Sequence, residues 1–445
     1  MTLRISGQRF LVIGAGKTGT AVATFLAARG GNVRLVERSK EVAGKLSLSG
    51  PVEVLVGDEH STALAGVDAV IPSPGVARTH PLLRAALCRV SPIMSEIELA
   101  SPFLDCPLIA ITGTNGKSTT TTLVGEMLRA AGSEVFVGGN LGTPLIEACA
   151  TERVYDAAIV EVSSFQLEWV QTFRPQVAVL LNVTPDHLDR YDSLEEYGRA
   201  KAAIFSSQLP GDFLVLNRDD AWVWEQRHHA HSASISFGQD AVEFGTFLDG
   251  NEIVYAGPEA PARRFSLDRT HLAGAHNREN MMAAVTAAAI WGTPAAAIQQ
   301  ALDSTGALPH RLELVRERDG VRFFDDSKGT NVGAMEKSVA SFDQGVVLLA
   351  GGYDKGSDFS VLAPLLRERV KYLVLFGAAG AKIEQQLGDA VPHSRFADLS
   401  AAVRDASRHA AAGDVVLLSP GCASFDEFTD YTARGRKFRE LVEAL

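Results

Sequence analysis

Residues 107–121, PLIAITGTNGKSTTT, join an apolar run to a glycine-rich turn that carries a lysine. Gly113 and Gly116 permit backbone conformations that other residues rarely adopt, so the N–H groups of such a turn can converge on one anion. A helix beginning near Lys117 would present the positive end of its dipole to the same anion. Lys117 can neutralise phosphate oxygens, and the Ser118 hydroxyl can bind Mg²⁺. The segment therefore predicts a nucleoside-triphosphate site.

This motif is shorter than the usual phosphate loop, because Ile111 stands where the first glycine belongs. On spacing alone, a glycine-rich turn without a ligand stays an alternative interpretation. The residues predicted to hold the phosphates are Gly113, Thr114, Asn115, Gly116, Lys117, Ser118 and Thr119.

Acidic and imidazole side chains follow two further apolar runs. Glu161 stands at the end of one run in IVEVSSFQLE, and Asp186, His187 and Asp189 follow another in LLNVTPDHLDRY. The carboxyl ends of parallel strands face the crevice where α/β proteins bind ligands. One such residue alone is typical of a hydrogen-bonded surface group, but the joint placement beside a phosphate loop predicts a metal site.

A second glycine turn, FLVIGAGKTGT at residues 10–20, fits two patterns. Gly14, Gly16 and Gly19 fit the dinucleotide fingerprint, while Gly16 with the following Lys and Thr resembles the end of a triphosphate loop. Glu37 ends the next apolar run, where dinucleotide-binding proteins place an acidic residue. Taken alone, this stretch leaves nicotinamide dinucleotide binding open.

These side chains need parallel strands to position them. Short apolar runs alternate with helical Ala/Leu-rich stretches in three blocks, which is typical of βαβ units. We predict an α/β protein of three domains: an N-terminal Rossmann-like domain, a central domain of the P-loop ATPase type, and a C-terminal Rossmann-like domain. Breaks near Ser91-Pro92 and Ser304–Pro309 suggest the boundaries, and the Ala-rich run around 283–305 is predicted as helix with a core face. The predicted domains are 1–93, 94–306 and 307–445.

Composition excludes several functional classes. The 445 residues carry 42 Lys and Arg against 53 Asp and Glu, a formal charge of -11, and no basic run, which argues against nucleic-acid binding. No apolar run is long enough to span a membrane, and four scattered cysteines indicate neither a disulfide framework nor a zinc site. We expect a soluble, monomeric protein of the reducing cytoplasm.

Seven motifs, in this order, give the chain a resemblance to the Mur ligase family that covers nearly its whole length. They are GTNGKST, VSSFQLE, NVTPDHLDRY, AGAHNREN, LPHRLE, DDSKGTN and SPGCASFDEF. The resemblance implies an ATP-dependent ligase that activates a carboxylate as an acyl phosphate and couples it to an amino acid, as in the synthesis of peptidoglycan precursors. It implies UDP-N-acetylmuramoyl-L-alanine and D-glutamate as the substrates. A sibling ligase with another amino acid is the alternative, weakened because the Asp-Asn-Pro-Arg motif of the diaminopimelate-adding branch is absent.

The resemblance also assigns roles to residues around ATP. It places Lys117, His187, Lys201 and Lys328 in catalysis, with Lys201 carbamylated by CO₂. It implies two Mg²⁺ sites served by Ser118, Glu161, His187 and Lys201. His276 and Asn277 match the adenine side, and the further ATP-binding positions are Asn280, Arg311 and Asp326.

Substrate positions follow from the same resemblance. The first domain is expected to hold the UDP portion of the substrate. The glycine fingerprint at Gly14 would then bind the diphosphate of UDP and not that of a nicotinamide dinucleotide. One position that is commonly Phe in the family is Tyr431 here. The substrate-binding residues implied are Gly14, Ala15, Gly16, Lys17, Thr18, Glu37, Arg38, Ser73, Pro74, Gly75, Asn140, Ser163, Thr330, Lys355, Ser424 and Tyr431.

Overall fold

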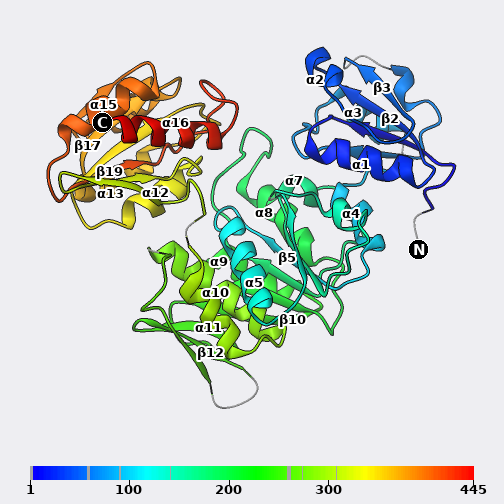
Figure 1. Ribbon diagram of the computed structural model, residues 1–445, viewed down its shortest axis with the longest axis horizontal. Helices are drawn as coiled ribbons and strands as arrows, with labels where there is room; N and C mark the ends of the chain where they lie inside the picture. Colours follow the sequence, from blue (N-terminus) through cyan, green and yellow to red (C-terminus); the bar gives the residue numbers. More distant parts are fainter. Residues whose placement is uncertain are drawn as a thin grey trace.

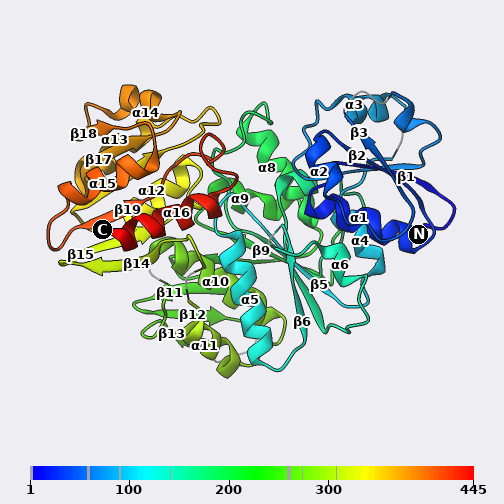
Figure 2. The same ribbon diagram turned by 45° about the horizontal axis from the view of Figure 1, so that its top comes forward.

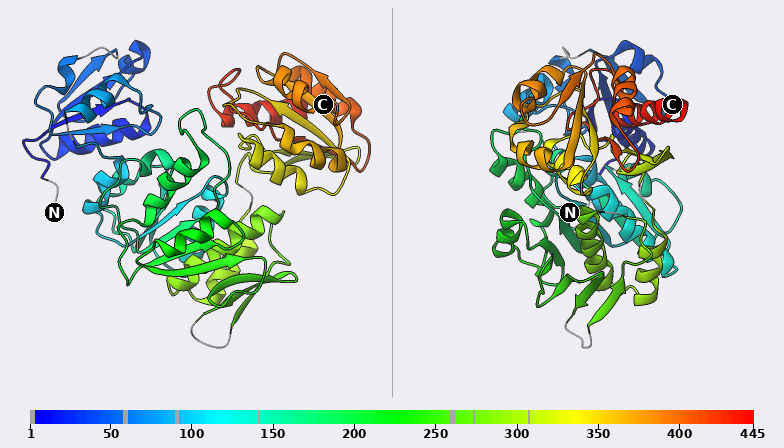
Figure 3. Two further views of the ribbon diagram at one scale, coloured as in Figure 1. Left: turned by 180° about the vertical axis from the view of Figure 1, so that it is seen from behind. Right: turned by 90° about the vertical axis from the view of Figure 1, so that its left-hand side faces the viewer.

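The computed structural model shows three lobes, with the N-terminal and C-terminal lobes on either side of a central one (Figure 1). The view from behind gives the same arrangement (Figure 3, left). The boundary residues Ser91 and Ala307 lie outside the described part of the chain. The structure describes residues 4–57, 61–89, 92–140, 142–257, 262–272, 274–306 and 308–445.

The N-terminal lobe contains a parallel four-stranded sheet in the order β3-β2-β1-β4. Its strands are β1 Arg9–Ile13, β2 Asn32–Glu37, β3 Val52–Val56 and β4 Ala69–Pro72. Its helices are α1 Lys17–Ala28, α2 Lys40–Gly44 and α3 Pro81–Cys88. β1 is buried after its first residue and runs through the glycine turn into α1, as the sequence predicts. Ile93 still pairs with Val70 of β4, so the first sheet extends to the predicted boundary.

The central lobe contains a nine-stranded sheet in the order β13-β12-β11-β10-β9-β8-β5-β7-β6. Its strands are β5 Leu108–Thr112, β6 Val135–Gly139, β7 Ala157–Glu161, β8 Val177–Leu180, β9 Phe213–Asn217, β10 Ala233–Gly238, β11 Gly245–Asp249, β12 Glu252–Ala256 and β13 Arg263–Ser266. The part from β6 to β11 is parallel, whereas β12 and β13 add an antiparallel edge. Because β5 lies between β7 and β8, the turns that follow these three strands open at one edge.

Helices cover both faces of the central sheet. They are α4 Glu96–Ala100, α5 Lys117–Ala130, α6 Leu145–Ala148, α7 Ser164–Leu167, α8 Leu194–Ala202, α9 Ala221–Glu225, α10 Ala275–Ile290 and α11 Ala295–Ser304. α10 and α11 both pack against α5 (Figure 2). The run around 283–305 that was predicted as helix is helical in two parts, which are separated because Gly292 adopts φ 91° and Pro294, which has no N–H, caps the second helix.

The C-terminal lobe contains a six-stranded sheet in the order β14-β15-β19-β16-β17-β18. Its strands are β14 Glu313–Arg318, β15 Val321–Asp325, β16 Val346–Gly351, β17 Val370–Phe376, β18 His393–Arg395 and β19 Val415–Leu418. Its helices are α12 Val332–Ala340, α13 Ala363–Arg369, α14 Gly380–Leu387, α15 Leu399–His409 and α16 Tyr431–Ala444. Only the β14–β15 pair is antiparallel.

The three lobes share their apolar cores unequally. One cluster of buried residues runs from Phe10 and Phe25 of the first lobe into the central lobe, where Phe103 meets Phe25 edge-on at 5.4 Å between ring centroids. The buried clusters of the C-terminal lobe contain only residues of that lobe. Within the described residues, no helix combines the length and apolar character needed to cross a bilayer.

Candidate active site

The turn after β5 forms the floor of the site. Gly113 has φ 154° and Gly116, which caps α5, has φ 87°, both in the region that favours glycine. A Cβ on Gly116 would lie 2.1 Å from Asn280 Oδ1, so α10 closes tightly on this turn. Lys117 folds back over it, and its Nζ donates to the carbonyl oxygens of Gly113 at 2.9 Å and Thr114 at 2.7 Å. Burial lowers the pKa of Lys117, with opposition from nearby Glu161 and Asp186.

Asn182, in the turn after β8, fixes the shape of this phosphate loop. Its Oδ1 accepts from the Asn115 backbone N–H at 2.8 Å, and its Nδ2 donates to the Asn115 carbonyl at 3.1 Å. Thr114 N–H donates to the Asn182 carbonyl at 2.9 Å. The loop is therefore bonded to the neighbouring strand end.

Glu161 ends β7 and is buried at 3% exposure. It accepts hydrogen bonds from the Ser118 hydroxyl and from Asn140 Nδ2, the latter at 2.6 Å. Burial alone would raise the pKa of Glu161, but the Lys117 cation and these hydrogen bonds outweigh it and hold the pKa below its usual value. An ionised carboxylate and a hydroxyl thus adjoin the phosphate loop, which is the oxygen set that Mg²⁺ prefers.

His187 follows β8 with φ 56° and faces the same cavity. Burial lowers its pKa to about 4, helped by Lys355, Lys201 and Lys117 and opposed by Asp186. Phe165 meets its ring edge-on, with 4.7 Å between ring centroids. The imidazole is therefore neutral at physiological pH and able to accept a proton or donate a lone pair.

Lys201 lies on α8 at 1% exposure, where a solvated helix lysine would be the ordinary expectation. Its Nζ donates to the Gly113 carbonyl at 2.8 Å and lies 4.3 Å from the centroid of the Tyr197 ring. No carboxylate within ion-pair distance of it occurs among the described residues. Burial and the Lys117 cation hold the pKa of Lys201 well below its usual value.

The C-terminal lobe closes the site from the opposite side. Arg311 Nη2 donates to the Ser118 hydroxyl at 2.6 Å, and Lys355 Nζ lies 3.2 Å from Asp186 Oδ1. Lys328 faces the cavity with its Nζ 4.1 Å from the Tyr431 ring centroid. Burial and the Arg311 cation lower the pKa of Lys328 to about 7.

Asp326 is buried below these groups. Its Oδ2 accepts hydrogen bonds from the hydroxyls of Ser338 at 2.6 Å and Ser419 at 2.8 Å. Burial raises the pKa of Asp326 to about 6 in spite of these bonds.

A second group of side chains extends the cavity along α10. His276 and Asn280 line it, and Lys337 of α12 bonds Glu279 at 2.9 Å across the lobe boundary. His276 Nδ1 is buried without a hydrogen-bond partner in the structure. Burial lowers the pKa of His276 to about 4, with Lys337 and Arg311 acting in the same direction.

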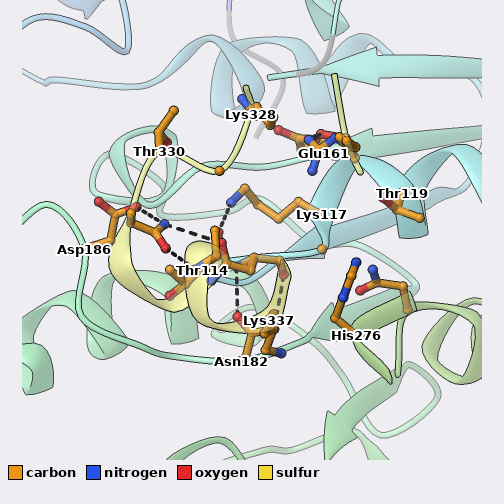
Figure 4. A pocket seen from close by; sticks show the side chains of 18 of the residues that line it. Thr114, Lys117, Thr119, Glu161, Asn182, Asp186, His276, Lys328, Thr330 and Lys337 are labelled. Carbon is orange, nitrogen blue, oxygen red and sulfur yellow. Dashed lines mark hydrogen bonds between the residues drawn. The ribbon is translucent and has the colours of Figure 1, made fainter. Parts of the chain in front are cut away.

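The predicted ATP-binding, metal and catalytic residues thus meet in one cavity between the central and C-terminal lobes. Figure 4 shows Lys117, Glu161 and Asp186 facing the same space as Lys328 and Thr330. Predicted residues lining it are Thr114, Asn115, Gly116, Lys117, Ser118, Thr119, Asn140, Glu161, Ser163, His187, Lys201, Asn280, Arg311, Asp326, Lys328 and Thr330.

The predicted UDP-binding residues form a separate cluster in the N-terminal lobe. Glu37 Oε2 accepts from the Ala15 N–H at 2.8 Å, and the Ser73 hydroxyl donates to the Gly14 carbonyl at 2.9 Å. Lys17 is exposed and donates to the Gly142 carbonyl of the central lobe at 2.7 Å. None of these residues lines the cavity of the phosphate loop.

Three predicted amino-acid-binding residues, Ser424, Tyr431 and Lys355, do not line the cavity. Ser424 is buried at 2% exposure in the turn before α16, and Tyr431 begins that helix beside Lys328. Lys355 reaches the site through its ion pair with Asp186.

Sequence reasoning gave no site role to Asn182, Asn331 or Lys337, and it named Asp186 only as one of the acidic residues that follow a strand near the phosphate loop. Asn331 Nδ2 donates to Asp186 Oδ2 at 2.9 Å, so this pair joins two lobes. Asn182 and Asp186 both belong to the motif that contains His187, and their position after the same strand was the available signal.

Three family models match successive parts of the chain. The Mur ligase MurD-like N-terminal domain matches residues 8–95, the Mur ligase middle domain 111–288, and the Mur ligase glutamate ligase domain 310–422.

Two curated relatives cover nearly the full length. The UDP-N-acetylmuramoylalanine–D-glutamate ligase of Syntrophus aciditrophicus is 45% identical over 446 residues, covering 99% of this chain and 98% of that protein. The ligase of the same name from Geobacter metallireducens is 44% identical over 453 residues, covering 100% and 99%.

Solved structures are similar in fold at low sequence identity. The UDP-N-acetylmuramate-alanine ligase of Thermotoga maritima has a TM-score of 0.62 at 18% identity, covering 98% of this chain and 99% of that one. A MurF ligase of the same organism, solved in complex with ADP, has a TM-score of 0.62 at 17% identity, covering 100% and 99%.

Proposed function

We propose, from the premise that the chain belongs to the Mur ligase family, that it joins D-glutamate to UDP-N-acetylmuramoyl-L-alanine in an ATP-dependent reaction. ATP activates the alanyl carboxylate as an acyl phosphate, the amine of D-glutamate displaces the phosphate, and ADP and phosphate leave. The product is a peptidoglycan precursor, so the protein serves cell-wall synthesis and, through it, cell shape and division.

One observation carries this proposal: the phosphate loop of the central lobe and the cations of the C-terminal lobe face one cavity. Lys117 comes from α5, whereas Arg311 and Lys328 come from beyond the boundary between the lobes. An acyl-phosphate reaction gathers negative charge on phosphoryl oxygens, and fixed cations in a water-poor site stabilise that charge. Closure of the C-terminal lobe brings two of the three cations to the site.

The residues present fit a bound nucleoside triphosphate. A side chain on Gly116 would collide with Asn280, so the phosphates can approach the loop backbone directly. Asn115 Nδ2 and His276 Nδ1 are buried without partners in the structure, which leaves two polar atoms for a ligand. We assign His276, Asn277 and Asn280 to the base and sugar side, and Arg311 and Asp326 to the phosphate side.

The donor set also fits Mg²⁺. Ser118 and Glu161 supply a hydroxyl and an ionised carboxylate for one ion, and His187 with carbamylated Lys201 would hold the second. When bound, Mg²⁺ offsets the charge of phosphoryl oxygens and orients them. Lys117 neutralises oxygens from the loop side, and the neutral His187 stands ready to bind metal or the substrate carboxylate.

Carbamylation of Lys201 is part of the proposal because of its surroundings. A buried ammonium without a carboxylate partner is costly, and CO₂ reacts with the neutral amine. The carbamate would turn this cation into an anion beside the Lys117 cation. A mass increase of the intact protein in bicarbonate, absent from Lys201→Arg, tests the assignment.

The two small substrates occupy different lobes in this proposal. The UDP portion lies on Gly14–Thr18, with Glu37 and Arg38 at the uracil side and Ser73–Gly75 closing the pocket. D-Glutamate lies between Thr330, Lys355, Ser424 and Tyr431 in this proposal, where the Lys355 ammonium and the Thr330 and Ser424 hydroxyls suit its carboxylates. Asn140 and Ser163 face the junction of the two substrates.

We also propose domain boundaries at 1–93, 94–306 and 307–445, and action as a monomer in the cytoplasm. The four cysteines are free, which suits a reducing compartment.

Phosphate release from ATP and Mg²⁺ tests the function, with UDP-N-acetylmuramoyl-L-alanine present and D-glutamate, L-glutamate, diaminopimelate or nothing added. Release that needs both the nucleotide precursor and D-glutamate is the expected result. Release with diaminopimelate instead would move the chain to a sibling activity, and no release in any combination would overturn the proposal.

A further inference from the structure

Arg190 lies in the turn after β8, where the N-terminal and central lobes meet, and no role described above uses it. Its side chain is 11% exposed. Nε and Nη2 donate to the two carboxylate oxygens of Glu168 at 2.9 and 2.7 Å. Nη1 donates to the Val76 carbonyl of the N-terminal lobe at 3.0 Å, and the guanidinium lies 4.1 Å from the centroid of the Phe165 ring. One planar group thus connects two lobes.

The Val76 end of this connection belongs to the first glycine loop. Val76 N–H donates to the Ser73 carbonyl at 2.9 Å, and the Ser73 hydroxyl bonds the Gly14 carbonyl. A Cβ on Gly14 would lie 3.4 Å from Val76 Cγ2. Movement of this loop therefore moves the acceptor that Arg190 holds.

The other end supports His187. Phe165 contacts Arg190 on its ring face and His187 at 4.7 Å between ring centroids. The Arg190 backbone N–H donates to the His187 carbonyl at 2.9 Å. His187 needs such support because its φ of 56° is unfavourable for a residue other than glycine.

We propose that Arg190 is a positioning residue that couples the place of the loop 73–76 to the orientation of His187. The inference rests on the proposed function, in which that loop closes on the UDP portion and His187 serves the reacting end of the same substrate. Binding of the UDP portion to the N-terminal lobe would then fix the orientation of the His187 imidazole through Arg190 and Phe165.

The chemistry of arginine matters here. Its fork can bond both oxygens of Glu168 and still reach Val76 while it lies flat on Phe165. A lysine keeps the charge but offers a single point of contact. Glu168 is itself 3% exposed on its side chain and accepts the Tyr191 hydroxyl at 2.5 Å, so the anchor of the fork is fixed.

The test is Arg190→Lys, with Arg78→Lys as the matched control. Arg78 lies at the same boundary, bonds Glu196 at 3.2 Å and places its Nε 4.0 Å from Glu168 Oε2, at the outer limit of an ion pair. Its side chain is 46% exposed, and no contact with Phe165 or His187 is found for it among the described residues. We expect Arg190→Lys to lower kcat about tenfold and to raise KM for UDP-N-acetylmuramoyl-L-alanine, with KM for ATP unchanged within about twofold. Arg78→Lys should stay within about twofold of the unchanged protein in all three constants.

A double-mutant cycle separates positioning from general weakening of the boundary. If Arg190 acts through Phe165, the kcat loss of Arg190→Lys combined with Phe165→Leu should equal the larger single loss and fall short of their product. Equal kinetics of the two lysine variants, or losses that multiply, would overturn the inference. If Arg190→Lys fails to fold, Glu168→Gln replaces it, and an unchanged kcat in that variant overturns the inference as well.

The unchanged protein in the same assay keeps the two proposals apart. If it forms no product from the nucleotide precursor and D-glutamate, the proposed function fails. If it forms product while Arg190→Lys matches Arg78→Lys, only the coupling fails.

Discussion

Two glycine turns in this molecule have similar sequences, GAGKTG and GTNGKST, but they differ in backbone conformation and in the direction of their lysine. In the N-terminal lobe, Gly16 caps α1 with φ -67° and Lys17 is exposed, reaching a carbonyl of another lobe. In the central lobe, Gly116 caps α5 with φ 87° and Lys117 folds back over its own turn. The lysine of the first turn is exposed, whereas the second turn lines the cavity between the central and C-terminal lobes.

The partners of the two turns differ as well. Glu37, an anion, accepts the Ala15 N–H of the first turn at 2.8 Å. Asn182, a neutral amide, accepts the Asn115 N–H of the second at 2.8 Å. A carboxylate beside a turn reduces its attraction for a highly charged anion, so the diphosphate and the triphosphate are assigned to different turns by charge as well as by shape.

The largest effect is expected when each of the two loop lysines is replaced separately by alanine. Lys117→Ala should lower kcat about 10³-fold, because a fixed cation at the phosphoryl group is lost. Lys17→Ala should raise KM for the UDP precursor about fivefold and leave kcat nearly unchanged, since this lysine is exposed. Steady-state kinetics with each substrate varied measures both. Equal kcat losses in the two variants would contradict the proposed difference between the two turns.

Alanine at the two helix caps tests backbone shape. Gly116→Ala places a methyl group against Asn280 at a positive φ, so kcat/KM for ATP should fall about 100-fold. Gly16→Ala meets no atom within 4 Å and keeps an ordinary φ, so the free energy of unfolding should change by less than about 0.5 kcal/mol. Thermal melting and ATP kinetics check the pair; normal ATP kinetics in Gly116→Ala would contradict the tight approach of α10.

Raising the pH should weaken the central site through Lys328. Its pKa is lowered to about 7, so the ammonium loses its proton as pH rises above 7. In the free enzyme kcat/KM for ATP should then fall about tenfold per pH unit above 7. Lys328→Arg keeps its charge throughout, and its profile should be flat in this range. A fall of the same size in Lys328→Arg would assign the titration to another group.

The smallest effect is expected at Glu37. Glu37→Gln keeps one acceptor oxygen but loses the charge that serves the N–H groups of Ala15 and Ser39, each at 2.8 Å. KM for the UDP precursor should change about fivefold, with KM for ATP unchanged. Kinetics with the precursor varied measure this. A shift in KM for ATP alone would show that the two turns are not independent.

The acidic and imidazole side chains at strand ends were predictable as site residues because the strand order places them together. Glu161 and His187 follow β7 and β8, which flank β5 and its loop, so a parallel sheet alone brings them to one edge. Apolar runs of four to six residues were enough to locate these strands.

Residues that act by joining lobes were not predictable. Asn331 with Asp186, and Lys337 with Glu279, meet only after the C-terminal lobe has docked, and nothing local to either residue specifies that geometry. The edge strands β13 and β14, both in antiparallel pairs, were not predicted because their sequences RRFS and ELVRER carry little apolar signal. Gly292 and Pro294 indicate the break between α10 and α11, but the Ala-rich sequences on both sides of it favour helix throughout.

The N-terminal and central lobes share one apolar core and the C-terminal lobe does not, which bears on the order in which the lobes fold during synthesis. The N-terminal and central lobes bury apolar residues in one continuous cluster, while the C-terminal lobe has cores of its own. During synthesis the first two lobes leave the ribosome first and can complete their common interior before residues 307–445 have been added. The last lobe then folds alone and attaches by polar contacts such as that of Arg311 with Ser118, which water can replace. The order of assembly on the ribosome therefore leaves a joint that can reopen once per turnover.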